Sequence, residues 1–118
     1  MARALSPKEA LSIKNKTIPF TGRWYNLLGT PDWCGVWFVW GNSGNGKTGF
    51  AVQLAKELAR FDLTAYNSLE EGVSLSMRNT LARHHMEDVN RRFRLLDCES
   101  MEDLGDRLRK PKSPHFAI

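Results

Sequence analysis

The sequence is poor in cysteine and has no long apolar run. Its 118 residues include two cysteines, Cys34 and Cys98, which lie far apart without a CxxC pair. This excludes a disulfide-built secreted domain and a cysteine zinc site, so we expect buried, reduced thiols. No stretch approaches the ~18 apolar residues of a membrane helix, and no apolar segment near the N-terminus is typical of a signal peptide. We therefore expect a cytoplasmic protein without a membrane partner.

An excess of one charge is also lacking over most of the chain. There are 17 basic and 13 acidic residues, which gives a formal net charge of +4. The basic excess lies in residues 1–31 and 107–112, whereas residues 32–106 carry more acidic than basic side chains. This distribution differs from the uniformly basic face of a dedicated nucleic-acid module. With 42% apolar and 25% charged residues, the composition is that of one small globular domain.

Helix and strand signals alternate along most of the chain. Apolar, β-branched and aromatic residues at 36–40 predict a buried strand of a parallel sheet. Helices are predicted at 6–13, 23–28, 47–60, 74–84 and 100–110, and further strands at 63–69, 93–96 and from 115. This order predicts an α/β fold in which a parallel sheet is sandwiched between helices. We divide the chain into a basic leader with a short helix, residues 1–31, and a core, residues 32–118.

A glycine-rich segment between the strand at 36–40 and the helix from 47 fits GxxxxGK[ST], the P-loop or Walker A motif. The motif consists of Gly41, Asn42, Ser43, Gly44, Asn45, Gly46, Lys47 and Thr48, and Gly49 follows it. Glycines let successive backbone N–H groups point at phosphate oxygens, and the helix N-terminus adds its own N–H groups and dipole. Lys47 supplies a positive charge for the outer phosphates, and the Thr48 hydroxyl is a hard oxygen ligand for Mg²⁺. The motif predicts binding of a nucleoside triphosphate with Mg²⁺.

Two carboxylates follow the predicted strand at 63–69. Glu70 and Glu71 stand where the carboxyl end of this strand faces the crevice in which open α/β sheets bind ligands. Hydrolysis needs a carboxylate that orients or deprotonates a water molecule near the terminal phosphate. The alternative is a solvated turn before the next helix, where acidic residues also favour the helix dipole. The residues alone leave both interpretations open.

Residues 40–48, together with Tyr66, Asn67, Ser68, Leu69, Glu70, Glu71 and Gly72, resemble the RecA/RadA/DnaB-like group of P-loop ATPases. Phage and prophage ATPases of this group are the members that the chain resembles most. The resemblance implies a RecA-like fold, ATP and Mg²⁺ as cofactors, and a role in DNA recombination or replication. It also implies that Glu70 primes the attacking water, beside Lys47 on the phosphates.

The chain departs from this family at its C-terminal end. Family members carry a later apolar strand that ends in the Walker B aspartate, and residues 115–118 resemble only the beginning of that strand. We therefore expect an incomplete RecA-like core, cut before the Mg²⁺-supporting carboxylate, with weak hydrolysis or none. We also expect self-association, because a central strand at 36–40 needs neighbours on both sides.

Two other functions remain open. The first is a nucleotide-binding fragment or regulatory module that binds ATP without turnover. The second is a P-loop small-molecule kinase, although neither an arginine-bearing lid nor an acceptor pocket is evident. Outside the motif, Arg91, Arg92 and Arg94 precede or enter a strand and fit either a partner or nucleic-acid contact or a solvated edge. His84 and His85 are expected at a solvated helix end.

Overall fold

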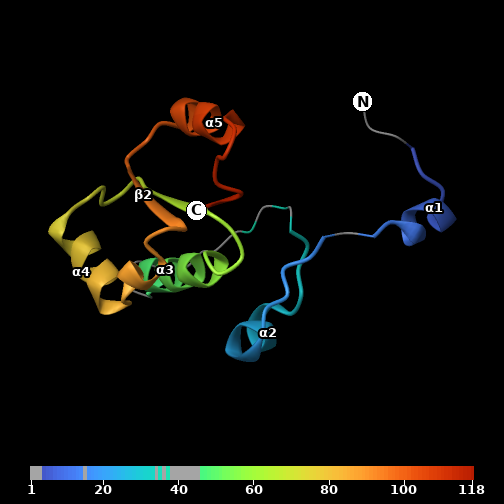
Figure 1. Cartoon of the computed structure of the whole chain (residues 1–118), viewed down its shortest axis with the longest axis horizontal. Coiled ribbons are helices and arrows are strands. Elements are labelled where there is room, and N and C mark those ends of the chain that lie inside the picture. Colours follow the sequence, from blue (N-terminus) through green and yellow to red (C-terminus); the bar gives the residue numbers. More distant parts are fainter. Residues whose placement is uncertain (1–3, 15, 34, 36, 38–45) are drawn as a thin grey trace. The chain divides into compact units, whose positions relative to one another are not determined.

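The computed structural model describes residues 4–14, 16–33, 35, 37 and 46–118. The chain forms two compact units, Met1–Phe38 and Val39–Ile118 (Figure 1). Residues 41–45 of the phosphate-binding motif lie outside the described residues, and so does the predicted strand at 36–40 except for Trp37. Cys34 also lies outside them.

The first unit contains two short helices, α1 (Pro7–Ser12) and α2 (Gly22–Leu28), as the sequence predicts. Ser6 caps α1 by accepting a hydrogen bond from the Glu9 backbone N–H, and the residues of α1 are all exposed. An antiparallel bridge joins Thr17 to Asp32. Apolar burial in this unit is centred on the side chains of Ile18, Phe20 and Trp24.

The second unit is an α/β arrangement built on a parallel sheet. Its helices are α3 (Lys47–Leu58), α4 (Leu75–Arg83), the 3-10 helix η1 (Met86–Val89) and α5 (Met101–Arg109). Its strands are β1 (Thr64–Ser68), β2 (Phe93–Asp97) and β3 (Phe116–Ala117), in the order β2-β1-β3. β1 pairs with β2 over five residues and with β3 over two. The predicted α/β class is therefore confirmed for the described residues.

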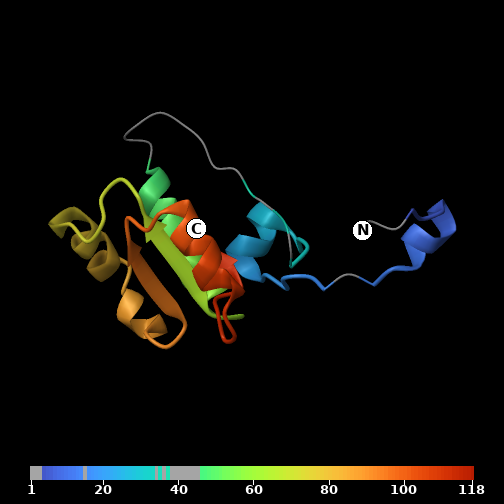
Figure 2. The same cartoon turned by 90° about the horizontal axis from the view of Figure 1, so that it is seen from above.

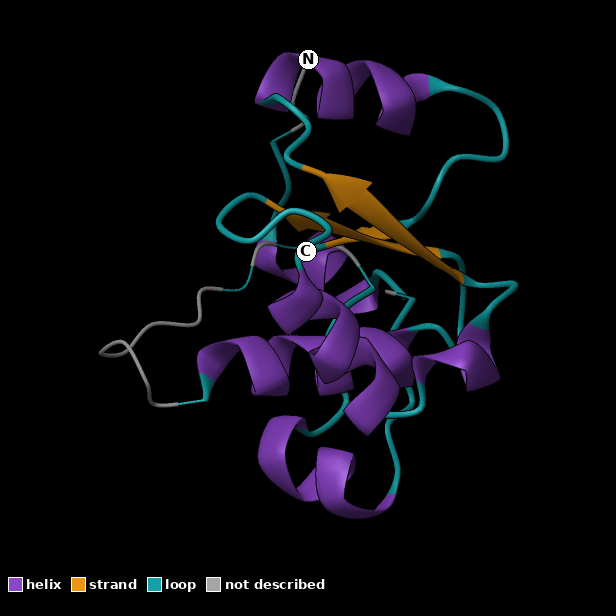
Figure 3. Cartoon of the chain, turned by 90° about the vertical axis from the view of Figure 1, so that its left-hand side faces the viewer, coloured by secondary structure: helices purple, strands orange, loops and turns teal. Residues whose placement is uncertain are grey.

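Helices cover both faces of this sheet. α5 lies on one face, and α3 and α4 lie on the other (Figure 1, Figure 3). Because a strand directs alternate side chains to opposite faces, Tyr66 of β1 packs on the α3 side, where it joins Val52, Ala55, Met77 and Met86 in the core. The sandwich that the sequence predicts is thus present around the three described strands.

The carboxyl ends of β1 and β2 run into two turns that pack against each other. The first turn follows Ser68 and contains Gly72 at φ 57°, whose N–H donates to the Ser68 carbonyl (3.1 Å). The second contains Cys98 at φ 51°, whose N–H donates to the same carbonyl (3.1 Å). Ser68 therefore ties both turns to the end of the central strand.

Candidate functional site

The described part of the phosphate-binding motif begins α3. Gly46 is the N-cap residue of this helix and has left-handed backbone angles, φ 77° and ψ 21°, which favour glycine. Gly46, as the N-cap residue, makes no side-chain hydrogen bond to the first turn, which begins with Lys47, Thr48 and Gly49. By contrast, serine side chains cap α1, α4 and α5. The start of α3 therefore lacks the serine cap of these other helices, and the positive end of its dipole favours an anion.

Lys47, Thr48 and Gly49 are half-buried, and Gly46 is exposed. The imidazole of His84, at the end of α4, packs against this turn: its Nε2 would lie 3.8 Å from a Cβ at Gly49. Nε2 is buried and has no hydrogen-bond partner among the described residues. Burial lowers the pKa of His84, and the positive charges of Arg83 and Lys56 lower it further. The surroundings of His84, beside the first turn of α3, therefore favour the neutral imidazole.

Glu70 and Glu71 lie in the turn after β1, at the carboxyl edge of the sheet, as predicted. Glu70 is exposed, whereas Glu71 is half-buried and its Oε2 is enclosed without a hydrogen-bond partner in the described part of the chain. Burial raises the pKa of Tyr66, and the negative charges of Glu71 and then Glu70 raise it further. Glu71 is therefore the carboxylate that points inward, and Glu70 is the one that reaches solvent.

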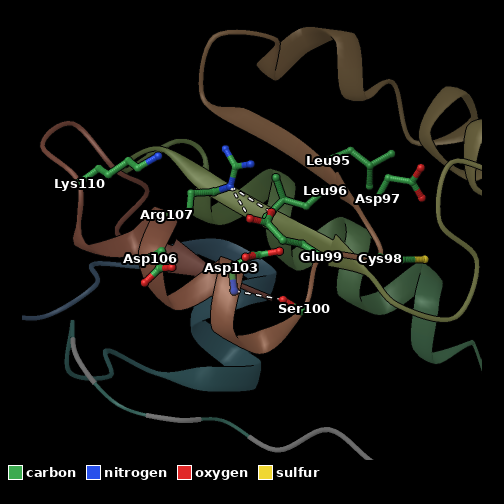
Figure 4. A pocket seen from close by; sticks show the side chains of 10 residues that line it. All are labelled: Leu95, Leu96, Asp97, Cys98, Glu99, Ser100, Asp103, Asp106, Arg107 and Lys110. Carbon is green, nitrogen blue, oxygen red and sulfur yellow. Dashed lines mark hydrogen bonds and ion pairs between the residues drawn. The ribbon is translucent and has the colours of Figure 1, made fainter.

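A network of hydrogen bonds holds the turn after β2, and Figure 4 shows its Glu99–Arg107 ion pair. The Asn67 side chain donates from Nδ2 to the Glu99 carbonyl (2.8 Å) and accepts from the Glu99 N–H at Oδ1 (2.9 Å). The Glu99 carboxylate in turn accepts from Arg107 Nε at 3.0 and 3.1 Å. This network holds the start of α5 against the end of the central strand.

A hollow of about 770 Å³ opens between the end of β2 and α5 (Figure 4). Its wall mixes acidic and basic side chains, and its Arg107 is already paired with Glu99. None of the described motif residues, Gly46, Lys47 and Thr48, lines it.

Cys98 corrects one expectation from the sequence. The thiol was expected to be buried, but Cys98 is exposed. It occupies the turn after β2 instead of a strand or helix, and its Sγ donates to the Ser68 carbonyl at 3.1 Å. The sequence contains no signal for this, because the position depends on where β2 ends.

The residues around α3 suit Mg²⁺ bound through phosphate and do not suit a metal held by protein ligands alone. Within the described ranges, no group of three His, Cys, Asp or Glu side chains could hold a metal ion. Mg²⁺ at nucleotide sites takes one or two protein oxygens, together with phosphate and water oxygens. The Thr48 hydroxyl, in the first turn of α3, is an oxygen of this kind.

Comparisons of the chain with family models, curated proteins and solved structures gave no match. Among the helices of the described residues, none has the length and apolar character needed to cross a membrane.

Proposed function

We propose that this chain binds a nucleoside triphosphate with Mg²⁺ at the N-terminus of α3, as part of a RecA-like P-loop ATPase that acts on DNA in recombination or replication. One observation carries the proposal: the Gly46-Lys47-Thr48 end of the motif begins a helix of 12 residues without a side-chain cap. A glycine with left-handed angles followed by uncapped N–H groups is the arrangement that phosphate oxygens require.

Each described residue has a distinct role in this proposal. The backbone N–H groups of the first turn donate to phosphate oxygens, and the Lys47 ammonium offsets the charge of the outer phosphates. The Thr48 hydroxyl would hold Mg²⁺, which supplies charge neutralisation on the phosphates when bound. The remaining motif residues, Gly41 to Asn45, are assigned to phosphate binding on the basis of the sequence motif alone.

Glu70 is the proposed water-orienting carboxylate, since it is exposed and can reach a water molecule at the carboxyl edge of the sheet. Glu71 is the competing assignment, because its enclosed oxygen has no partner that would already use it. Either carboxylate would hold the attacking water by accepting its hydrogen bond and then its proton.

Titration of the full chain with ATP and Mg²⁺ tests the binding step. Lys47→Ala should weaken ATP binding by about 10- to 100-fold, since a charged hydrogen bond contributes about 1.5–3 kcal/mol. Lys110→Ala, at the end of α5, is the charge-matched control and should leave the affinity unchanged. Equal affinity of the Lys47→Ala variant and the unaltered chain would contradict the proposal.

Turnover separates the two carboxylates and also separates an ATPase from a binding module. If the chain hydrolyses ATP, replacement of the water-orienting residue by glutamine should lower the rate by about 10²- to 10⁴-fold without weakening binding. Glu70→Gln and Glu71→Gln are therefore compared side by side, with and without single-stranded DNA. Tight binding without turnover would identify the chain as a nucleotide-binding module, and a phosphorylated acceptor would identify a kinase.

A further inference from the structure

A second feature of the fold lies at the opposite end of α3. The C-terminus of α3, η1 and the turn before β2 enclose a groove of about 640 Å³. Because this turn leads into β2 and the end of α3 leads into β1, the groove lies at the amino edge of the sheet. Helix α3, about 18 Å long at 1.5 Å per residue, separates this groove from the phosphate-binding motif.

Three arginines line this groove, namely Arg60, Arg91 and Arg92. Within the described ranges, no carboxylate lies at ion-pair distance from Arg91 or Arg92, whereas Arg60 pairs with Glu57. Arg92 uses NH1 to donate to the Arg60 carbonyl (3.0 Å), which leaves the other N–H donors of its guanidinium for a ligand. The groove therefore presents at least two arginines that are not neutralised.

Glu87 and Asp88, which also line the groove, and Asp62 have partners other than the groove arginines. Asp88 lies 3.4 Å from the Lys56 ammonium, and Glu87 lies 3.8 Å from His85. Asp62, whose pKa responds to the charge of Arg92, accepts from the Leu63 N–H at 2.7 Å and contacts His115 at 2.5 Å. These contacts reduce the ability of the carboxylates to offset Arg91 and Arg92.

We propose that this groove binds the phosphate backbone of a single-stranded nucleic acid. The planar guanidinium fork matches phosphate oxygens in pairs, and all the cations that line the groove are arginines. Arginines from two separate segments, the end of α3 and the turn before β2, can contact successive phosphates of one strand. Because contacts to phosphate carry no information about the bases, binding should be sequence-independent and should depend strongly on salt.

This surface is independent of the nucleotide site, and its test needs neither ATP nor Mg²⁺. Fluorescence anisotropy of the full chain with a labelled oligothymidylate of about 20 nucleotides measures the affinity. Repeating the titration from about 50 to about 200 mM salt gives the slope of log affinity against log salt. Failure of ATP binding would leave this measurement unaffected, so the two proposals can fail separately.

Arg91→Ala/Arg92→Ala should bind the oligonucleotide about tenfold more weakly at low salt, and its salt slope should fall by about 1.4, since each phosphate contact contributes about 0.7 for single strands. Arg91→Ala alone removes one of these two contacts, so the salt slope should fall by about 0.7. The Arg91 side chain is exposed and makes no hydrogen bond or ion pair within the described residues, so this variant should fold like the unaltered chain. Glu87→Gln removes a negative charge from the groove wall and should tighten binding about twofold.

Arg109→Ala/Lys110→Ala removes two positive charges from the end of α5 and is the matched control. Its affinity for the oligonucleotide should stay near that of the unaltered chain. Four results would overturn the proposal. These are no oligonucleotide binding by the unaltered chain, an unchanged salt slope in the Arg91→Ala/Arg92→Ala variant, an equal loss in the α5 control, or tighter binding of an acidic peptide than of the oligonucleotide.

Discussion

At the scale of single residues, the pKa values of His84 and Asp62 are both lowered, but for different reasons. Burial and nearby positive charges lower the pKa of the His84 imidazole. Burial alone would raise the pKa of Asp62, but the hydrogen bond with His115 and the Leu63 N–H outweigh it. Both folded-state values lie below the unfolded values, so both residues contribute stability above their unfolded pKa, and this contribution is lost as the pH falls.

For His84 this predicts a loss of stability in mild acid. As the pH falls from about 7.5 to about 5, the unfolded chain should take up a proton on His84 before the folded chain does. The free energy of unfolding should therefore fall over this range, and His84→Gln should flatten the dependence. Urea unfolding at a series of pH values measures the effect.

The choice between Glu70 and Glu71 shows what the sequence could predict at this scale. Its pattern placed both residues after β1, because strand propensity and the following turn are local signals. It could not distinguish them, because adjacent residues differ only in side-chain direction, which the turn around Gly72 determines. The packing of His84 beside Gly49 was likewise beyond prediction, since it depends on how α4 lies against α3.

At the scale of elements, the turn between β1 and α4 is the most constrained connection near the candidate site. Gly72 has φ 57°, and a Cβ there would meet the Asp97 carboxylate and lie 3.3 Å from Cys98 Sγ. Gly72→Ala should lower the free energy of unfolding by about 2 kcal/mol, since left-handed backbone and a close contact act together. Gly105→Ala, inside α5, should have the opposite effect and raise the free energy of unfolding by about 0.5–1 kcal/mol. Urea unfolding of both variants measures the difference, and equal effects would contradict this reasoning.

Most elements could be predicted because their signals are local. The helices predicted at 6–13, 74–84 and 100–110 correspond to α1, α4 and α5, each of which follows a capping serine in the structure, and the motif placed the start of α3 at Lys47. The 3-10 helix η1 was missed, because it follows His85 at φ 53°, a conformation for which histidine gives no sequence signal. The helix predicted at 100–110 is confirmed as α5, which continues through Gly105 to Arg109.

At the scale of the whole molecule, the second unit is held by a core that joins α3, β1, α4 and η1. Met77 of α4 is 1% exposed and lies in this core, whereas Met101 at the start of α5 is 72% exposed. Met77→Ala should lower the free energy of unfolding by about 2–5 kcal/mol through lost burial and a cavity. Met101→Ala should change it by less than about 0.5 kcal/mol. Urea unfolding monitored by circular dichroism compares the two, and similar midpoints would contradict this account of the core.

At this scale, the arrangement of charged residues in the fold is more informative than the net charge of the chain. The net charge of +4 indicates little about a partner, because much of the basic excess lies in residues 1–31 and 107–112. The groove lined by Arg60, Arg91 and Arg92 lies within the range that is acidic overall. Folding brings these arginines together from two segments of the chain, and the net charge calculated from the sequence does not show this. Self-association, expected from the strand at 36–40, stays a prediction that concerns mostly residues outside the described ranges.

The contact between Asn67 and Glu99 has a further consequence. A side-chain amide that both donates to and accepts from one backbone residue behaves as a substitute peptide group. It joins β1 to Glu99, one residue beyond the last main-chain hydrogen bond between the two segments, from the Cys98 N–H to the Ser68 carbonyl. Aspartate is nearly the same size, but it would place an oxygen opposite the Glu99 carbonyl and turn this attraction into repulsion. The Nδ2 amide of Asn67 therefore helps to hold the segment before α5 at the end of the central strand, and a carboxylate could not replace it.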